Sequence, residues 1–281
     1  MTDEAFEFEY PRVLSIAGSD SGGGAGIQAD LKTFAALGCY GMTAITALTA
    51  QNTQGVRAIH GVPPAMLRAQ IDAVLDDIGA HAVKIGMLHS PDIVLTVAEA
   101  IDRHGLKKVV LDPVMVATSG AVLIDKPAIA VLVRELFGRA SVVTPNLDEA
   151  ALLVGRSLDS EQAMEAAARE LLAMGAPAVL LKGGHLAGDV VSDLLLTQKG
   201  ERHWLRAPRI RTANTHGTGC TLSSAMAAQL ALGDSLLDAV QAARAFVRAA
   251  LQAGARVRTG AGGSGPLNHG YAPQAMRLKS L

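Results

Sequence analysis

The chain has 281 residues, of which 49% are hydrophobic and 3% aromatic, and its formal net charge is -1. The near-neutral charge, without a dense Lys/Arg run, argues against a nucleic-acid partner, and no apolar run reaches the roughly 18 residues of a membrane span. The only cysteines, Cys39 and Cys220, argue against a disulfide framework and fit a reducing compartment. Because the acidic N-terminus does not read as a secretory signal, we expect a cytoplasmic protein.

Short apolar runs alternate with helical segments along the first two thirds of the chain. The sequence predicts strands over 13–17, 42–50, 82–85, 108–111, 141–144 and 178–181, and helices over 26–37, 63–78, 91–104 and 127–137. This alternation is typical of βαβ units and of a parallel sheet covered on both faces. Ligands collect at the carboxyl ends of such strands, where the polar residues Asp112, Asn146 and Lys182 follow the apolar runs.

The last third changes character. Residues 190–197 and 204–210 are predicted strands that suit an antiparallel edge, and two Ala-rich helices are expected over 218–232 and 235–255. No repeat or linker-like break interrupts the chain. We therefore expect a single domain over residues 11–281, preceded by a tail over residues 1–10.

The segment 214–220, Asn-Thr-His-Gly-Thr-Gly-Cys, stands directly before the first of these helices. Its glycines allow a tight turn, so the amides of Gly217, Thr218, Gly219 and Cys220 can face one small space at a helix N-terminus, which favours an anion. The thiol of Cys220 lies where cysteine pKa values tend to fall. The segment predicts an anion cradle for phosphoryl transfer; the alternative is an ordinary helix entrance with glycines for the turn.

A second glycine cluster, residues 18–26, follows the first strand. Residues 24–29, Gly-Ala-Gly-Ile-Gln-Ala, fit a dinucleotide-binding pattern, but that pattern requires an acidic residue about 20 positions later. No Asp or Glu stands between Asp30 and Asp72, which disfavours a nicotinamide enzyme. A P-loop, the protein-kinase motifs and a G-x-S-x-G elbow do not occur.

Six segments in order resemble hydroxymethylpyrimidine/phosphomethylpyrimidine kinase of thiamine biosynthesis. They are residues 18–34, Lys-Ile-Gly-Met-Leu at 84–88, Leu-Asp-Pro-Val-Met at 111–115, Thr-Pro-Asn-Leu-Asp-Glu-Ala at 144–150, Lys-Gly-Gly-His at 182–185, and 214–220. The resemblance implies a ribokinase-like three-layer αβα sandwich with a mostly parallel central sheet. It also implies ATP and Mg²⁺, a homodimer, and two successive phosphorylations, of 4-amino-5-hydroxymethyl-2-methylpyrimidine and then of its monophosphate.

The same resemblance suggests roles around the phosphates. Cys220 stands where related kinases have a catalytic aspartate, and the cradle of Gly217, Thr218 and Gly219 would hold the transferred phosphoryl group. Asn146 and Glu149 match an N-x-x-E motif that positions Mg²⁺, with Asp112 as a second candidate ligand. Lys182, Asn146 and Thr218 are the expected ATP contacts. Glu149 could instead be an ordinary first-turn helix acid, and Lys182 a solvated lysine at a strand end.

For the pyrimidine, the family pattern points to Gly18, Asp30, Gln51, Met87 and Val114, with Asp30 as a plain surface acid in the alternative reading. Gln51 can both donate and accept hydrogen bonds, whereas some relatives carry Glu there. Thr118 stands where many relatives have a lysine, so a cationic contact from that loop is in doubt.

Three other interpretations stay open. A pyridoxal/pyridoxine kinase, or an enzyme with both activities, is the nearest, because that ring also bears hydroxymethyl and methyl groups. Cys220 in place of Asp favours the pyrimidine. A phosphate- or nucleotide-binding regulator without turnover is disfavoured by the complete cradle, and a dehydrogenase by the missing ribose acid.

Overall fold

The computed structural model describes residues 6–116, 120 and 123–281 of the chain. The strands are β1 (Phe8–Glu9), β2 (Arg12–Asp20), β3 (Tyr40–Asn52), β4 (Gly55–Gly61), β5 (Ala82–Ile85), β6 (Val109–Leu111), β7 (Val142–Val143), β8 (Ala178–Leu181), β9 (Val190–Thr197), β10 (Arg202–Pro208) and β11 (Lys279–Ser280). The helices are α1 (Gly26–Ala36), α2 (Pro64–Leu75), α3 (Pro91–His104), α4 (Lys126–Leu136), the short 3-10 helix η1 (Phe137–Arg139), α5 (Leu147–Val154), α6 (Glu161–Ala173), α7 (Thr218–Leu232) and α8 (Leu236–Gly254).

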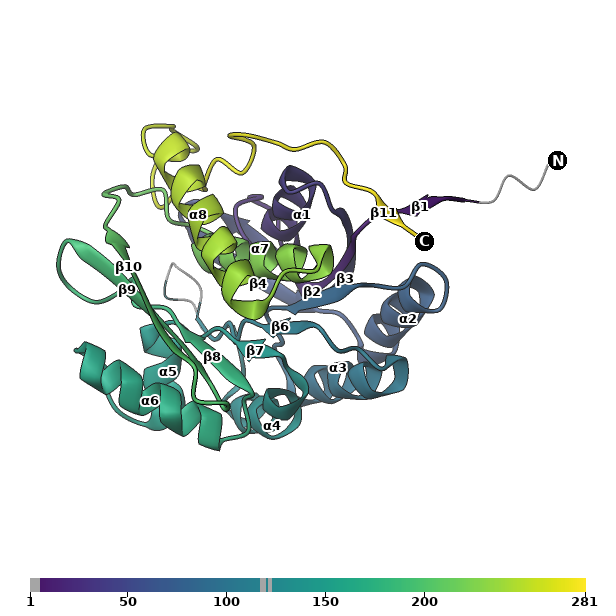
Figure 1. Cartoon of the computed structure of the whole chain (residues 1–281), viewed down its shortest axis with the longest axis horizontal. Coiled ribbons are helices and arrows are strands. Elements are labelled where there is room, and N and C mark those ends of the chain that lie inside the picture. Colours follow the sequence, from purple (N-terminus) through teal and green to yellow (C-terminus); the bar gives the residue numbers. More distant parts are fainter. Residues whose placement is uncertain (1–5, 117–119, 121–122) are drawn as a thin grey trace.

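One large sheet organises the molecule (Figure 1). Its nine strands follow the order β10-β9-β8-β7-β6-β5-β2-β3-β4, and the six from β8 to β3 are mutually parallel. Strands β9 and β10 at one edge and β4 at the other are antiparallel. The expected α/β architecture with a mostly parallel sheet and the predicted antiparallel edge are confirmed. The tail assigned to residues 1–10 overlaps β1, which pairs with β11 in a separate two-stranded sheet.

The two faces of the sheet carry different helices, and the alternation of side chains explains why. In β2, Leu14 and Ile16 belong to one apolar core with α2 to α6, while Val13, next to Leu14, belongs to a second core with α1, α7 and α8. Successive side chains of a strand point to opposite faces, so a strand buried on both sides reads as a continuous apolar run. Figure 1 shows the resulting three layers, helices on both sides of the sheet.

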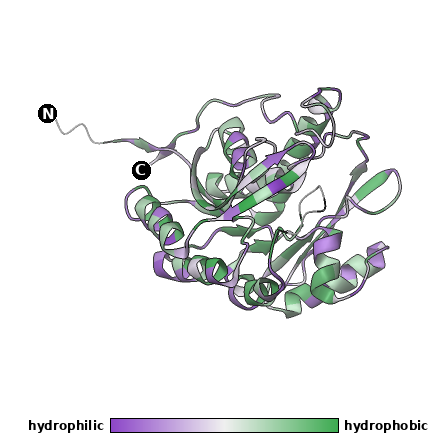
Figure 2. Cartoon of the chain, turned by 180° about the vertical axis from the view of Figure 1, so that it is seen from behind, coloured by the Kyte–Doolittle hydropathy of each residue, from purple (hydrophilic) through white to green (hydrophobic). Residues whose placement is uncertain are grey.

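Helix α7 lies deepest in the fold. Its residues from Thr221 to Ala228 are all buried, because α1, α8 and the sheet cover it. Hydrophobic residues fill the central strands, whereas hydrophilic ones mark the outer helices, as Figure 2 shows. Within the described residues, no helix is both long and apolar enough to cross a membrane.

Most predicted boundaries lie close to the observed ones, although the predicted helix over 63–78 ends at Leu75. The elements for which no range was predicted are β1, β4, β11, η1, α5 and α6. Strand β4 was not predicted because it is an edge strand in which no residue is fully buried, so its sequence shows no apolar alternation. Helix α6 buries Met164, Ala167, Ala168 and Leu171 at helical spacing behind a Ser160 cap, which is a signal that the sequence does contain.

Candidate active site

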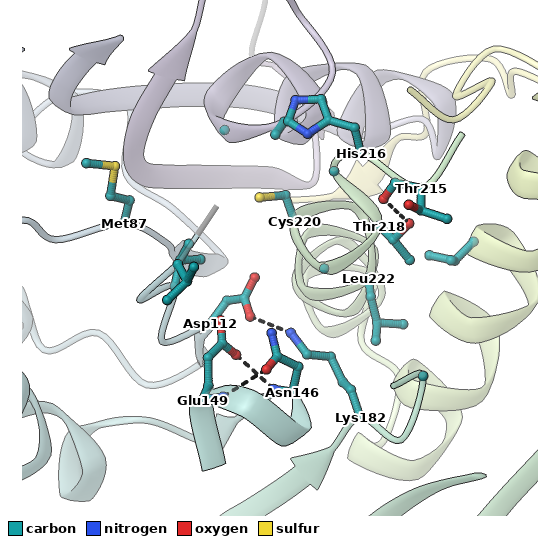
Figure 3. Close-up of a pocket in the computed structure, with 18 of the residues that line it drawn as sticks. Met87, Asp112, Asn146, Glu149, Lys182, Thr215, His216, Thr218, Cys220 and Leu222 are labelled. Atoms are coloured by element: carbon teal, nitrogen blue, oxygen red, sulfur yellow. Dashed lines mark hydrogen bonds and ion pairs between the residues drawn. The ribbon is translucent and has the colours of Figure 1, made fainter. Parts of the chain in front are cut away.

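A cavity of about 700 Å³ opens at the carboxyl end of the parallel strands, the edge where the sequence predicts ligand binding. Its walls come from the ends of β2, β3 and β5, from the segments after β6, β7 and β8, and from the first turn of α7 (Figure 3). The predicted site residues that line it are Gly18, Gln51, Met87, Asp112, Val114, Asn146, Glu149, Lys182, Gly217, Thr218, Gly219 and Cys220.

The turn that begins α7 presents free amides to the cavity, although fewer than the sequence predicts. Gly217 has a φ of 83°, and a Cβ there would lie 1.8 Å from the carbonyl oxygen of Gly24, so only glycine fits. The amide of Thr218 donates to the carbonyl of Thr215 at 3.2 Å and is not free. The amides of Gly219 and Cys220 meet no acceptor within the described part of the chain, and they remain available to an anion.

Cys220 is the third residue of α7, and its thiol is only partly exposed. Burial raises the pKa of this thiol to about 11, although the nearby charge of Lys84 acts in the opposite direction. The expectation that the helix N-terminus lowers this pKa is therefore wrong for the ligand-free site. The reason is that desolvation of the thiolate outweighs the cation and the amide of Gly26, which also stabilises the thiolate.

Asp112 and Lys182 form an ion pair across the cavity floor. The ammonium of Lys182 lies 2.8 Å from Oδ1 of Asp112, and the hydroxyl of Ser223 donates to Oδ2 at 3.1 Å. Burial alone would raise the pKa of Asp112, but the charges of Lys182 and Lys84 hold it below its ordinary value. Lys182 is thus a paired lysine in the cavity wall rather than a solvated strand-end residue (Figure 3).

Asn146 and Glu149 begin α5 with a reciprocal capping arrangement. The side-chain oxygen of Asn146 accepts from the amide of Glu149 at 2.9 Å, and the carboxylate of Glu149 accepts from the amide of Asn146 at 2.8 Å. Glu149 is nevertheless buried, unlike an ordinary first-turn acid. Burial raises its pKa to about 7, with the charge of Asp112 adding to the effect and that of Lys182 opposing it.

The donor set around Glu149 fits a water-rich Mg²⁺ site. The described residues contain no group of three His, Cys, Asp or Glu side chains that could enclose a metal. Mg²⁺ keeps several waters and is commonly held by one or two carboxylates together with substrate phosphates, so Glu149 and Asp112 are a sufficient protein contribution. A dication beside these two carboxylates would also offset the repulsion that raises the pKa of Glu149.

Gly18, Met87 and Val114 line a small part of the cavity next to Cys220. A Cβ on Gly18 would lie 3.1 Å from the sulfur of Met87, so glycine leaves room for a flat ring between this wall and Val114. The amide group of Gln51 lies between Thr49 and His216, at 3.1 Å from the Thr49 hydroxyl and 3.4 Å from the His216 ring nitrogen. The hydroxyl of Thr49 donates to Oε1 of Gln51 and holds the amide group at the edge of this pocket.

Asp30 departs from its predicted place. It is fully buried and does not line the cavity, and both of its oxygens are occupied by donors from Ser15, Ser224 and Lys84. The structure thus supports neither a direct contact with the pyrimidine nor the surface acid of the alternative reading. The other uncertain residue, Thr118, lies outside the described part of the chain.

Asp20 and His216 were not assigned a role from the sequence. Nε2 of His216 donates to Oδ2 of Asp20 at 2.8 Å, and the amides of Gly22, Gly24 and Ala25 donate to the same carboxylate. This pair ties the first glycine cluster to the turn before α7. The signal was an Asp two residues before a glycine, which is typical of a side chain that binds its own loop.

Aliphatic and basic side chains together line the end of the cavity near α7 and α8. Ile210, Leu222, Val247 and Leu251 come from the chain after β10 and from these two helices, and Arg209, Arg244 and Arg248 line the cavity from the same segments. The aliphatic side chains fit a flat, mostly apolar ring system. They were not predicted from the sequence, since aliphatic side chains beside Ala-rich helices are typical of a core.

Comparisons with known proteins agree with this geometry. The family model described as phosphomethylpyrimidine kinase matches residues 20–268. The chain is 52% identical to a hydroxymethylpyrimidine/phosphomethylpyrimidine kinase of Rhizobium meliloti, covering 91% of this chain and 96% of that protein. It is 49% identical to a thiamine biosynthesis bifunctional protein of Geobacter sulfurreducens over 95% of this chain, and it spans only 54% of that protein.

Solved structures show the same fold. The structure of a pyridoxal kinase from Staphylococcus aureus in complex with AMP-PCP and pyridoxal superposes with a TM-score of 0.86 at 32% identity, covering 97% of this chain and all of that one. The ribokinase-like fold is therefore confirmed.

Proposed function

The chain belongs to the phosphomethylpyrimidine kinase family and is a phosphotransferase, and from this premise we propose its substrates. They are ATP and 4-amino-5-hydroxymethyl-2-methylpyrimidine, which is phosphorylated first to the monophosphate and then to the diphosphate for thiamine biosynthesis. One observation carries the proposal: the free amides at the start of α7 lie between a small pocket for one ring and aliphatic side chains for another.

The two ends of the cavity suit the two substrates. The end with Leu222 and Val247 would take the adenine, while Gly18, Met87 and Val114 would enclose the pyrimidine. Gln51 would form hydrogen bonds with the polar edge of the pyrimidine ring. The γ-phosphoryl group would then lie at the amides of Gly219 and Cys220, where ammonium groups and helix dipole neutralise its charge.

In the proposed reaction, the hydroxyl oxygen of the pyrimidine forms a bond to the γ-phosphorus as the bond to the bridging oxygen of ADP breaks. The hydroxyl proton passes to the sulfur of a deprotonated Cys220, which returns it to solvent after product release. With a pKa of about 11, few resting thiols are ionised, but each thiolate is a strong base. Alignment and charge neutralisation then supply the main part of the rate enhancement.

Glu149 and Asp112 are the residues that would hold Mg²⁺, with Asn146 keeping Glu149 in place through the helix cap. When bound, the ion neutralises charge on the phosphates. Lys182 contributes a second positive charge from its ion pair with Asp112.

A pyridoxal kinase activity is the second candidate, because solved pyridoxal kinases share the fold at TM-scores up to 0.86. The decisive experiment measures ADP release with MgATP and either alcohol. We expect ATP consumption that depends on the pyrimidine, with a higher kcat/KM for the pyrimidine than for pyridoxine. Equal values would assign both activities, and no alcohol-dependent ADP release with either would leave a non-catalytic binding protein.

We also propose a homodimer and a cytoplasmic location. Support for the dimer comes from Leu48 and Ile59, apolar side chains exposed on the neighbouring strands β3 and β4 at one edge of the sheet. Light scattering after size-exclusion chromatography should give a molar mass of twice the 29.0 kDa of the single chain.

A further inference from the structure

A buried network of charged and hydroxyl groups reaches α7 at Ser224, four residues after Cys220. The ammonium of Lys84 on β5 lies 3.0 and 2.9 Å from the two carboxylate oxygens of Asp30 on α1. The hydroxyl of Ser15 on β2 donates to Oδ2 of Asp30 at 2.5 Å, and that of Ser224 on α7 donates to Oδ1 at 2.6 Å. All four side chains are fully buried.

Stability alone is a weak reason for such a network. Removing two charges from water is costly, and a buried ion pair is often no more stabilising than apolar residues of the same volume. Gly86 leaves room for the ammonium, since a Cβ at that position would lie only 2.9 Å from Nζ of Lys84. A role beyond packing is therefore expected.

The network and Cys220 share one helix and one cavity. Ser224 stands one turn after Cys220 on α7, so both side chains lie on the same face of the helix. Lys84 and Cys220 line the same cavity. Because Asp30 is held by two hydroxyls and one ammonium, it fixes the ammonium of Lys84 in position at the cavity floor.

Four charged groups act on Cys220 from the surrounding elements. The cations are Lys84 on β5 and Lys182 after β8, and the anions are Asp30 on α1 and Asp112 after β6. Of these groups Lys84 most strongly lowers the pKa of the thiol, whereas Asp30 and Asp112 raise it. Both cations are paired, Lys182 with Asp112 and Lys84 with Asp30, and of the two it is Lys84 whose charge acts more strongly on the sulfur.

We propose that Lys84, oriented by Asp30, Ser15 and Ser224, is a positioning residue that stabilises negative charge on Cys220 so that its sulfur can accept the hydroxyl proton of the substrate. This inference rests on the proposed function. The thiol first loses its proton to solvent, and Lys84 stabilises the thiolate. The thiolate then takes the proton as the oxygen–phosphorus bond forms, and it becomes neutral again.

The test measures the thiol itself and needs no turnover. In a Cys39→Ala background, which leaves Cys220 as the only cysteine, the rate of alkylation by iodoacetamide is followed in short pulses from pH 7 to 12.5 by intact mass. The pH midpoint of this rate reports the pKa of Cys220 independently of access to the cavity. We expect Lys84→Met to raise the midpoint and to lower the alkylation rate at fixed pH by about tenfold, the equivalent of one pKa unit.

Asp30→Asn should shift the midpoint in the opposite direction, because it removes an anion, while the amide oxygen can accept from one serine hydroxyl and the amide nitrogen can donate to the other. The matched control is Lys108→Met. Lys108 also contacts α7, but through the carbonyl of Leu230 near the far end of a 15-residue helix, roughly 15 Å along the helix from Cys220. This control should leave the midpoint and turnover unchanged.

Lys84→Met leaves Asp30 buried without its cation and can prevent folding. The double variant Lys84→Met/Asp30→Asn removes both charges, and we expect its midpoint to lie above that of the parent. Opposite shifts for the single variants, or a raised midpoint in the double variant, support the proposal. Unchanged midpoints in Asp30→Asn and in the double variant would show that the network stabilises the fold and does not act on Cys220. Because alkylation requires neither ATP nor pyrimidine, a failure of the proposed substrates leaves this result readable.

Discussion

Glu149→Gln is expected to stabilise the metal-free protein while it weakens catalysis. The pKa of Glu149 is about 7 in the folded chain, against 4.5 for an ordinary glutamate, because burial disfavours its charged form. The folded chain therefore binds this proton more tightly than the unfolded chain, and stability falls as the pH rises from 4.5 to about 7. Above that window the ionised carboxylate costs about 3 kcal/mol, at about 1.4 kcal/mol for each pKa unit.

Glutamine removes this cost and keeps an oxygen that can accept from the amide of Asn146. At pH 8 in EDTA, thermal unfolding of Glu149→Gln should occur about 5–10 °C above the parent. Added Mg²⁺ and ATP should stabilise the parent more than the variant, and turnover of the variant should fall. Asp148→Asn, at an exposed acid in the same helical turn, is the control for stability and should not raise Tm. An unchanged Tm for Glu149→Gln at pH 8 would refute the reasoning.

Three further predictions follow from the cavity and its supports. In initial-rate assays, Gln51→Ala should raise KM for the pyrimidine about 2- to 12-fold and leave KM for ATP unchanged. This factor corresponds to about 0.5–1.5 kcal/mol for one lost hydrogen bond. Equal changes in both KM values would show that Gln51 has a structural role. Cys220→Ser should lower kcat by about 10²–10⁴-fold, and near-parent activity across pH would show that the amides and Mg²⁺ suffice without a base. Burial lowers the pKa of His269 from 6.5 to about 4, so the unfolded chain takes up this proton first and about 3 kcal/mol of stability is lost as the pH falls through that window. Urea unfolding measured at pH 7.5 and at pH 4.5 should show that His269→Gln loses less free energy of unfolding between the two pH values than the parent does. Identical losses would contradict this assignment.

Local sequence patterns predicted the sheet and the place of the cavity well. Apolar runs such as 82–85 and 178–181 are buried on both faces, so their composition alone marks them as central strands. The polar residues after them meet at one edge because parallel strands end together. The glycine at 217 likewise predicted a tight turn, since its backbone admits no other residue.

Electrostatics of the site could not be predicted in the same way. The pKa of Cys220 depends on how deeply α7 is covered and on Lys84, which is more than 130 positions away in the chain. Asp30 was predicted to contact the pyrimidine, or else to be a surface acid, because nothing near it in sequence indicates that Ser15, Lys84 and Ser224 converge on it. Burial and long-range pairing are properties of the packed fold, and they decide both cases.

The most direct test of the account follows the products of one reaction over time. The protein is mixed with MgATP and 4-amino-5-hydroxymethyl-2-methylpyrimidine, and the pyrimidine species are resolved by liquid chromatography and mass spectrometry. We predict that the monophosphate appears first and is then converted to the diphosphate, with one ADP formed for each phosphoryl group transferred. ADP formation without any phosphorylated pyrimidine would contradict the account.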